Sequence, residues 1–310
     1  MPSTTTSMPS GSAGTHAPFG RVLTAMVTPF SNDGSLDLDA AQRVAAHLVD
    51  TGCDGLVVSG TTGESPTTSD GEKEQLVRAV VDAVGDRAQV VAGVGTYDTH
   101  HSVELAGQAE KAGAHGLLVV TPYYNKPPQA GLVRHFSTIA DATGLPVMLY
   151  DIPGRTGTPI ETETLLRLAQ HQRIVAVKDA KGDLFAGSEV IARSGLAFYS
   201  GDDALNLPWL SVGAAGMVSV VAHVAAGRYR SMVRAVLAGD LAEALRLHRE
   251  LIPAVRGVMT KKSQGAIMAK AALTLVGVLS SRTMRSPLVD ATDDQVTELQ
   301  AALVAAGLLT

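Results

Sequence analysis

The chain has 310 residues, of which 45% are hydrophobic and 18% charged, and its formal net charge is -5. This length suits one large domain or two small ones, and the composition is typical of a globular protein with a large core. The acidic balance provides no basic field for a phosphate backbone, which argues against a nucleic-acid partner. The single cysteine, Cys53, excludes an internal disulfide and a cysteine metal cluster. Its place beside a predicted strand indicates a small core residue.

The N-terminal segment is rich in Ser, Thr, Gly and Pro, and it lacks the basic start and apolar run of a secretory signal. It buries too little apolar surface to offset the entropy of ordering, so residues 1–18 are predicted to be a disordered tail. No uninterrupted apolar run of about 18 residues appears, which argues against a membrane span. We therefore expect a cytoplasmic protein with no membrane partner.

Eight short apolar runs, each followed by a stretch with helical spacing, make up the body of the chain. Most runs are continuously apolar, as expected for parallel strands buried on both faces. The predicted strands are 22–27, 55–60, 89–94, 116–121, 146–151, 174–179, 196–201 and 215–220. The predicted helices between and after them are 37–51, 70–84, 100–113, 129–143, 161–171, 184–194, 204–213 and 223–238. This alternation predicts a closed (β/α)₈ TIM barrel over residues 19–238.

An open doubly wound sheet is the competing arrangement. It would carry the glycine fingerprint GxGxxG after its first strand, where this chain reads TPFSNDG. Beyond residue 238 the strands stop, and 240–256, 261–278 and 292–306 have helical spacing with Gly and Pro between them. We interpret residues 239–310 as a C-terminal extension of three helices packed on the barrel.

Functional residues of such barrels gather at the C-terminal ends of the strands, and Lys178 occupies such an end. It follows the apolar run IVAV, so a side chain pointing into the barrel would be poorly solvated. A free lysine has a pKa near 10.4, and roughly 0.1% of it is neutral at pH 7.4. Desolvation favours the neutral amine, which is the form that attacks a carbonyl. The alternative is a strand-end lysine pointing to solvent.

Other polar side chains follow neighbouring strands. Tyr150 ends the preceding strand, where its hydroxyl could pass protons near an imine. Thr61 and Thr62 lie in a glycine-bounded turn whose hydroxyl and N–H groups suit a carboxylate, and Arg155 could bind a second carboxylate in bidentate fashion. Ordinary packing, turn chemistry and a surface arginine are the respective alternatives.

Asp202 and Asp203 also end a strand, and a carboxylate pair can bind a metal ion. No His or third carboxylate joins them at the predicted strand ends. We therefore interpret them as a hydrogen-bonding loop and expect no metal site.

Five motifs together resemble the dihydrodipicolinate synthase family, within the pyruvate-dependent class I aldolase superfamily. They are GTTGESPT (60–67), TPYYNKPPQAGL (121–132), YDIPGRTG (150–157), VKDAKGD (177–183) and SGDDAL (200–205). The resemblance covers about residues 20 to 305, and the order and spacing of the motifs match.

The resemblance implies roles for the strand-end residues. Lys178 matches the lysine that forms a Schiff base with pyruvate. Tyr150 and Thr61 match two members of a proton relay, and Tyr124 matches the tyrosine that completes it from a neighbouring subunit. Thr62 matches the residue that binds the pyruvate carboxylate.

Further implications concern the second substrate and the assembly. Arg155 matches the arginine that receives the carboxylate of L-aspartate 4-semialdehyde, and Val218 lies where the family lines the pyruvate site. The implied reaction gives 4-hydroxy-tetrahydrodipicolinate, the first step of the diaminopimelate and lysine branch, without cofactor or metal. Family members are mostly homotetramers built as dimers of dimers. Asp151 departs from the family, where many members carry asparagine, and we expect a structural role for it.

Two alternatives remain at this point. A lyase for N-acetylneuraminate or for keto-deoxy sugar acids would share the lysine and the tyrosine. Arg155 and the second threonine of GTTGE favour the synthase, because sialate lyases usually carry serine-threonine in that turn. A non-catalytic barrel would be indicated by loss of Lys178 or Tyr150, and both are present.

The resemblance also bears on regulation by L-lysine. Sensitive members bind lysine at the dimer interface, where a glutamate pairs with its ammonium group. The corresponding position here is His101, and Lys73 adds a like charge nearby. We expect weak inhibition or none, unless Asp70 or Asp98 replaces the missing carboxylate.

Overall fold

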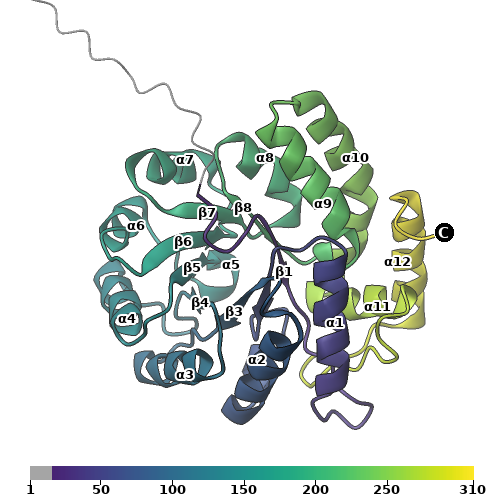
Figure 1. Ribbon diagram of the computed structural model, residues 1–310, viewed down its shortest axis with the longest axis horizontal. Helices are drawn as coiled ribbons and strands as arrows, with labels where there is room; N and C mark the ends of the chain where they lie inside the picture. Colours follow the sequence, from purple (N-terminus) through teal and green to yellow (C-terminus); the bar gives the residue numbers. More distant parts are fainter. Residues whose placement is uncertain (1–15) are drawn as a thin grey trace, which may run out of the picture.

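The computed structural model describes residues 16–310, which form a closed barrel of eight parallel strands surrounded by helices (Figure 1). Each strand pairs with the next one along the chain, and β8 closes the barrel against β1. The predicted TIM barrel is confirmed. The strands are β1 (Val22–Ala25), β2 (Gly55–Val58), β3 (Gln89–Gly93), β4 (Gly116–Val120), β5 (Val147–Asp151), β6 (Ile174–Asp179), β7 (Ala197–Ser200) and β8 (Gly216–Ser219).

Successive strand side chains alternate between the barrel interior and the layer beneath the helices. The interior cluster includes Met148 and Tyr150 of β5 and Ala176 of β6, whereas Leu149 and Val177 belong to the outer core. Both faces are apolar because both are covered, which explains the continuously apolar runs. Since Ala176 faces inward, the lysine two residues later also faces the interior.

Helices follow the strands and cover the barrel on the outside (Figure 1). Each buries one apolar stripe, as α1 does through Ala41, Val44 and Leu48. The helices of the barrel are α1 (Leu38–Asp50), α2 (Asp70–Val84), α3 (Thr99–Lys111), α4 (Gln129–Asp141), α5 (Pro153–Thr156), α6 (Thr162–Leu168), α7 (Leu184–Arg193), α8 (Asn206–Ser211) and α9 (Ala222–Leu237), with short 3₁₀ turns η1 (Ser65–Thr67) and η2 (Asp203–Leu205).

Three further helices form the C-terminal extension: α10 (Leu241–Val258), α11 (Gly265–Leu275) and α12 (Asp293–Ala305). They lie together on the side of the barrel that carries α1 and α9 (Figure 1). Leu251 of α10 and Leu299 and Leu303 of α12 are buried in the outer core. The predicted three-helix extension is therefore present, and its core is continuous with that of the barrel.

The structure differs from the predicted boundaries where chain segments turn into loops. Strand β2 ends at Val58 because Ser59 adopts a positive φ of 57°, which leaves the sheet. The helix expected from residue 261 begins only at Gly265, after an extended Gln264. Sequence spacing did not predict α5, because a Pro-Gly pair is usually read as a loop.

The chain closes the floor of the barrel before β1 begins. Phe19 is fully buried, and its ring lies 6.5 Å from that of Tyr199, centroid to centroid. The Tyr199 hydroxyl accepts from the Phe19 N–H at 3.3 Å and donates to the Gly20 carbonyl at 3.0 Å. Residues 1–15 of the predicted tail lie outside the described residues. Among residues 16–310, no helix is long and apolar enough to span a bilayer.

Candidate active site

Lys178 is the last but one residue of β6, inside the top of the barrel, and is only 5% exposed. It pairs in register with Tyr150 of β5, and its Nζ lies 4.1 Å from the centre of the Tyr150 ring. Gly201 follows β7 beside it, where a Cβ atom would lie 3.0 Å from the lysine Cγ. The predicted adjacency of the two strand ends is therefore observed, and a glycine leaves room for the lysine side chain.

Burial lowers the pKa of Lys178 to about 8, and the Arg155 guanidinium acts in the same direction. The Asp203 carboxylate opposes the shift but forms no ion pair with Lys178 among the described residues. At a pKa of 8, about a fifth of the amine is neutral at pH 7.4, against roughly 0.1% for a free lysine. The site therefore supplies the nucleophilic form of the amine at neutral pH.

Tyr150 is also buried, at 5% exposure. Burial raises the pKa of its hydroxyl to about 12, against smaller opposing effects of Arg155 and the Thr61 hydroxyl. The phenol therefore stays protonated at neutral pH and can act as a proton donor. Thr61 comes from the loop after β2, so the structure brings together residues that the sequence separates by about ninety positions.

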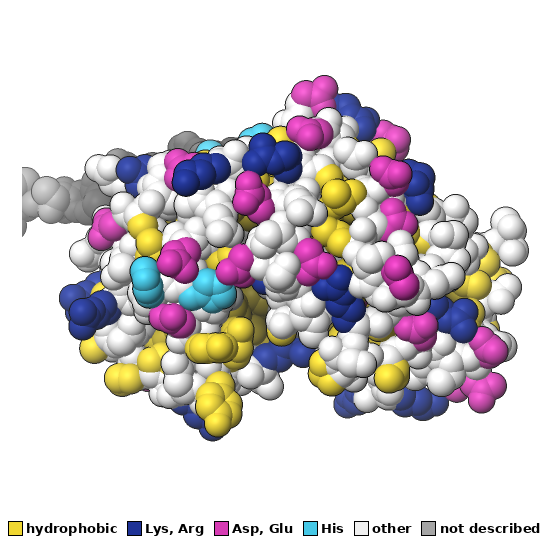
Figure 2. All heavy atoms as spheres, turned by 90° about the horizontal axis from the view of Figure 1, so that it is seen from below, with side chains coloured by type: hydrophobic (Ala, Val, Ile, Leu, Met, Phe, Trp, Pro, Cys, Tyr) yellow, Lys and Arg dark blue, Asp and Glu magenta, His cyan; other side chains and the backbone are white. Residues whose placement is uncertain are grey.

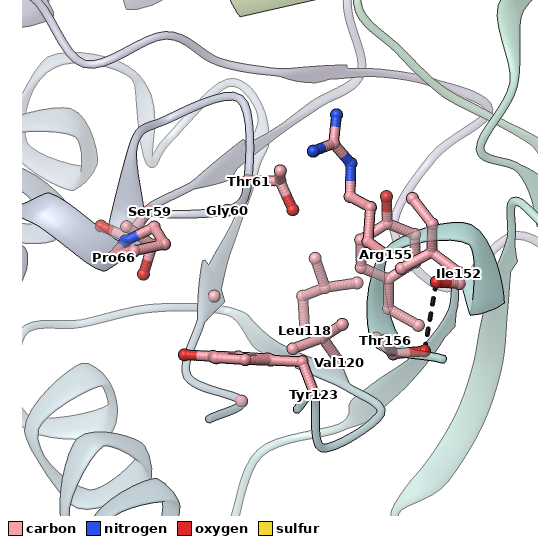
Figure 3. A pocket seen from close by; sticks show the side chains of 14 residues that line it. Ser59, Gly60, Thr61, Pro66, Leu118, Val120, Tyr123, Ile152, Arg155 and Thr156 are labelled. Carbon is pink, nitrogen blue, oxygen red and sulfur yellow. Dashed lines mark hydrogen bonds between the residues drawn. The ribbon is translucent and has the colours of Figure 1, made fainter. Parts of the chain in front are cut away.

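A pocket of about 230 Å³ opens beside these groups, smaller than the roughly 300–1,000 Å³ of drug-sized ligand sites. In Figure 3, Thr61, Tyr123 and Arg155 lie around it on the loops after β2, β4 and β5. The lining consists of Ser59, Gly60, Thr61, Ser65, Pro66, Gly93, Gly95, Leu118, Val120, Tyr123, Tyr150, Ile152, Arg155 and Thr156. Its size suits small substrates.

Arg155 reaches the pocket from the single turn of α5. Gly157 ends this turn in a left-handed conformation, and the Thr156 hydroxyl donates to the Ile152 carbonyl at 3.1 Å (Figure 3). The guanidinium donates to Gln264 Oε1 at 3.0 Å, so the segment before α11 contacts it. The other N–H groups of a guanidinium can still bind a carboxylate in bidentate fashion.

Lys178 and the remaining predicted site residues lie outside the pocket lining. Thr62 is 9% exposed in the turn beside Thr61, and Val218 is buried in the interior cluster with Tyr150. Tyr124 is 92% exposed and adopts a positive φ of 73°. Within one chain, Tyr124 therefore does not reach Tyr150.

Asp203 is buried and hydrogen-bonded on both carboxylate oxygens. Oδ2 accepts from the backbone N–H groups of Val220 and Val221 at 2.8 and 3.1 Å. Oδ1 accepts from the side chains of Asn206, Ser219 and Tyr229. Asp202 accepts from the Ala204 N–H at 3.0 Å at the start of η2. The predicted hydrogen-bonding interpretation of this pair matches these contacts.

A second layer of acidic groups supports the end of β6. Asp179 Oδ1 accepts from the N–H groups of Lys181 and Gly182 at 3.1 and 2.8 Å, and burial raises the pKa of Asp179 to about 6. The fully buried Asp151 accepts from the Ile160 N–H at 3.2 Å, and its Oδ2 lies 3.2 Å from Lys181 Nζ. These contacts agree with the structural role expected for Asp151.

Sequence analysis missed several lining residues. Tyr123 precedes Tyr124 in the same motif, and the motif gives no indication of which ring faces the pocket. Gly93 ends β3 and Gly95 follows it, and Cβ atoms at these positions would lie 2.4 Å from the Ser59 carbonyl oxygen and 2.3 Å from the Val120 nitrogen, respectively. The signal available in the sequence was the Gly-Val-Gly spacing at a strand end, which indicates close backbone approach.

Known proteins resemble this chain over nearly its whole length. The model of the dihydrodipicolinate synthetase family matches residues 18–306. The 4-hydroxy-tetrahydrodipicolinate synthase of Kineococcus radiotolerans is 67% identical, covering 94% of each chain, and that of Acidothermus cellulolyticus is 66% identical with the same coverage. A crystal structure of the Cyanidioschyzon merolae enzyme with lysine bound is 41% identical, has a TM-score of 0.91 and covers 95% of this chain and 100% of that one. The chain therefore belongs to the dihydrodipicolinate synthetase family.

Proposed function

We propose that this chain condenses pyruvate with L-aspartate 4-semialdehyde to give 4-hydroxy-tetrahydrodipicolinate, with Lys178 as the nucleophile. The observation that carries the proposal is a buried lysine that forms no ion pair within residues 16–310 and lies against a buried tyrosine that lines a small pocket. Family membership supports the same reaction, since the bacterial relatives at 66–67% identity are named for this product.

The chemistry begins with the neutral amine of Lys178. It attacks the ketone carbon of pyruvate, and loss of water leaves a protonated imine. This cation withdraws electrons from the adjacent methyl group, so loss of one proton gives an enamine. The enamine carbon attacks the aldehyde carbon of the second substrate, and the aldehyde oxygen takes up a proton. The amine of that substrate then attacks the imine carbon, which closes the ring and releases Lys178.

Tyr150 and Thr61 are suited to moving the protons of these steps. The carbinolamine must gain a proton on its hydroxyl before water leaves, and the protonated Tyr150 phenol lies beside the lysine. Thr61 lines the same pocket and can pass the proton onward. Tyr124 of a second copy would complete the relay.

Two carboxylates must be held in place. The Thr61–Thr62 turn follows β2, and Thr61 lines the pocket. The turn can offer hydroxyl and N–H donors to the pyruvate carboxylate. Arg155 lines the same pocket, where its guanidinium would bind the carboxylate of the incoming aldehyde (Figure 3). The bound acceptor is thereby oriented with its aldehyde toward Lys178.

The exposed Tyr124 supports an assembly in which a second copy contributes to each site. The Tyr124 ring is 92% exposed, and its φ of 73° is a strained backbone conformation. Such strain persists where surrounding groups hold the residue in place, and a second copy would supply those groups. In Figure 2, hydrophobic side chains gather beside a hollow on one face, while charges of both signs are interspersed over the rest. We propose a dimer that exchanges Tyr124 and pairs into a homotetramer. Cytoplasmic location stays a prediction.

Reductive trapping tests the reaction. Incubation with pyruvate and borohydride should add one reduced pyruvate to Lys178, as located by mass spectrometry of peptides. The trapped form should lose turnover of L-aspartate 4-semialdehyde, which the untreated protein converts with pyruvate. Selective turnover of N-acetylmannosamine instead would favour the sialate lyase, and the absence of any adduct would reject the Schiff-base mechanism.

A further inference from the structure

A second lysine is fully buried outside the pocket lining. Lys270 of α11 has no exposed side-chain surface, and its Nζ lies 2.5 Å from Oε1 of the equally buried Glu64. The same Nζ donates to the Thr283 carbonyl at 2.7 Å and lies 4.3 Å from the centre of the Phe30 ring. Burial lowers the pKa of Lys270, and the Glu64 carboxylate opposes that shift. The ammonium group is thus surrounded by a carboxylate, a carbonyl and an aromatic face.

Glu64 is the residue that ends the glycine-threonine turn of the pocket. Its φ of 53° is left-handed, which is uncommon for a side chain of this kind. Its N–H donates to the Thr61 carbonyl at 3.1 Å, and its second carboxylate oxygen accepts from the Arg285 N–H at 2.9 Å. The carboxylate therefore fixes the backbone of the turn to the C-terminal extension.

Arg285 secures the other end of the same loop. Its guanidinium donates to both carboxylate oxygens of Glu72 at 2.6 and 2.9 Å and to the Thr67 carbonyl at 2.9 Å. Glu72 lies in the first turn of α2, which follows the loop that leaves β2. Residues 283–285 thus hold the loop at Glu64 and at its C-terminal end, directly after the segment that carries the threonines.

A contribution to stability alone does not explain where the Lys270–Glu64 ion pair lies. Ion pairs such as that of Lys262 and Glu298 lie on the surface, with side chains that are 71% and 66% exposed. The buried pair instead acts on a left-handed residue two positions from Thr62 and three from Thr61. Displacing its carboxylate would release the conformation that presents those donors.

We propose that Glu64 is a positioning residue for the keto-acid site, held by Lys270 so that the C-terminal extension sets the geometry of the Thr61–Thr62 turn. The proposal rests on the carboxylate-binding role proposed for that turn. The Glu64–Lys270 ion pair would thus affect the kinetics of the reaction although neither residue contacts a substrate.

The test is a double-mutant cycle on the full-length protein. Lys270→Met leaves the Glu64 carboxylate buried without its cation, so the turn should shift. We expect kcat/KM for pyruvate to fall about tenfold or more, mainly through KM, because displacements below 1 Å suffice for such losses. In Glu64→Gln with Lys270→Met, the amide can accept from the Arg285 N–H and donate to the Thr283 carbonyl. This double variant should recover kcat/KM to within about threefold of the parent.

Leu303→Ala is the matched control, since it removes a fully buried side chain from α12 without touching Glu64. It should lower the melting temperature and leave KM for pyruvate unchanged at a temperature where all variants are folded. Unchanged KM in folded Lys270→Met would overturn the positioning role, and so would an equal rise in KM for Leu303→Ala. Thr62→Ala with unaltered pyruvate trapping would instead show that the assigned carboxylate site is wrong.

Discussion

The two buried lysines of this protein show how the proposed nucleophile differs from a structural cation. Lys178 and Lys270 are both nearly inaccessible, and burial lowers the pKa of both. Lys270 has a carboxylate at 2.5 Å, whereas Lys178 has an aromatic ring at 4.1 Å and no ion pair among the described residues. The carboxylate near Lys178, Asp203, is occupied by five donors of its own. Burial alone therefore does not create a reactive amine. The group that contacts the amine decides whether it is reactive.

The largest expected effect concerns activity, for which Lys178 should be required and Lys270 should not. Lys178→Ala should abolish pyruvate trapping and lower kcat by several orders of magnitude, because the covalent route is lost. Lys270→Met should still form the trapped adduct. Peptide mass spectrometry and steady-state rates measure both. An adduct that persists on another lysine in Lys178→Ala would break the comparison.

The next-largest effect concerns stability, to which Lys270 should contribute more than Lys178. Lys270→Met should lower the free energy of unfolding by about 3–5 kcal/mol, because it leaves a buried carboxylate without its cation. Lys178→Met should leave stability unchanged or raise it, because it removes a buried amine that forms no ion pair among the described residues. Denaturant unfolding of the two variants measures the contrast. A loss for Lys178→Met as large as that for Lys270→Met would indicate an unrecognised partner.

Arg155 is a third cation, and it is the exposed one. Arg155→Ala should cost about 2–3 kcal/mol in kcat/KM for L-aspartate 4-semialdehyde, since a charge-assisted contact to the acceptor is lost. Pyruvate trapping should remain near the parent rate. The ratio of the two assays identifies the role, and an equal fall in both would assign Arg155 to the structure of the site.

The pH dependence sharpens the contrast further. Burial lowers the pKa of Lys178 from its ordinary 10.5 to about 8, so imine formation should rise with pH toward 8 and level off above it. The unfolded chain binds more protons at this lysine between about pH 8 and 10.5, so its contribution makes stability rise with pH in that window. Single-turnover trapping measures the first effect. A rate still rising tenfold per pH unit at pH 9 would contradict the lowered pKa.

The smallest expected effect concerns inhibition by free L-lysine. An ammonium entering near His101 needs a free carboxylate, and Asp70 is engaged by His101 Nε2 at 2.9 Å and by Lys73 at 3.6 Å. Asp98 caps α3 through the His100 N–H at 3.0 Å. Millimolar L-lysine should therefore inhibit weakly or not at all, and His101→Glu should increase inhibition. Strong inhibition of the parent below 1 mM would reject this expectation.

Sequence patterns predicted Lys178 better than Lys270 for a physical reason. A lysine ending an apolar strand of a barrel has its position fixed by period and topology, and its neighbour Tyr150 follows from one β/α unit. Lys270 lies within an apolar helix, where spacing indicates burial but names no partner. Its carboxylate lies 206 positions away, and only the packing of α11 against the loop after β2 brings them together.

The same limit applied to the pocket itself. Continuous apolar runs were enough to place eight strands, because both faces of a parallel barrel are covered. They could not show that Tyr123 rather than Tyr124 lines the pocket of its own chain, since adjacent loop residues have no fixed period. The single turn α5 was hidden by its Pro-Gly start, which favours a loop when read alone.

The distance between Glu64 and Lys270 along the chain has a consequence for biosynthesis. At roughly 5–20 residues per second, about ten to forty seconds separate the emergence of Glu64 from that of Lys270 on the ribosome. All eight strands are synthesised before the counter-ion arrives, since β8 ends at Ser219. A nascent barrel can therefore assemble around an uncompensated carboxylate, and helices translated after the barrel then fix the loop that follows its second strand.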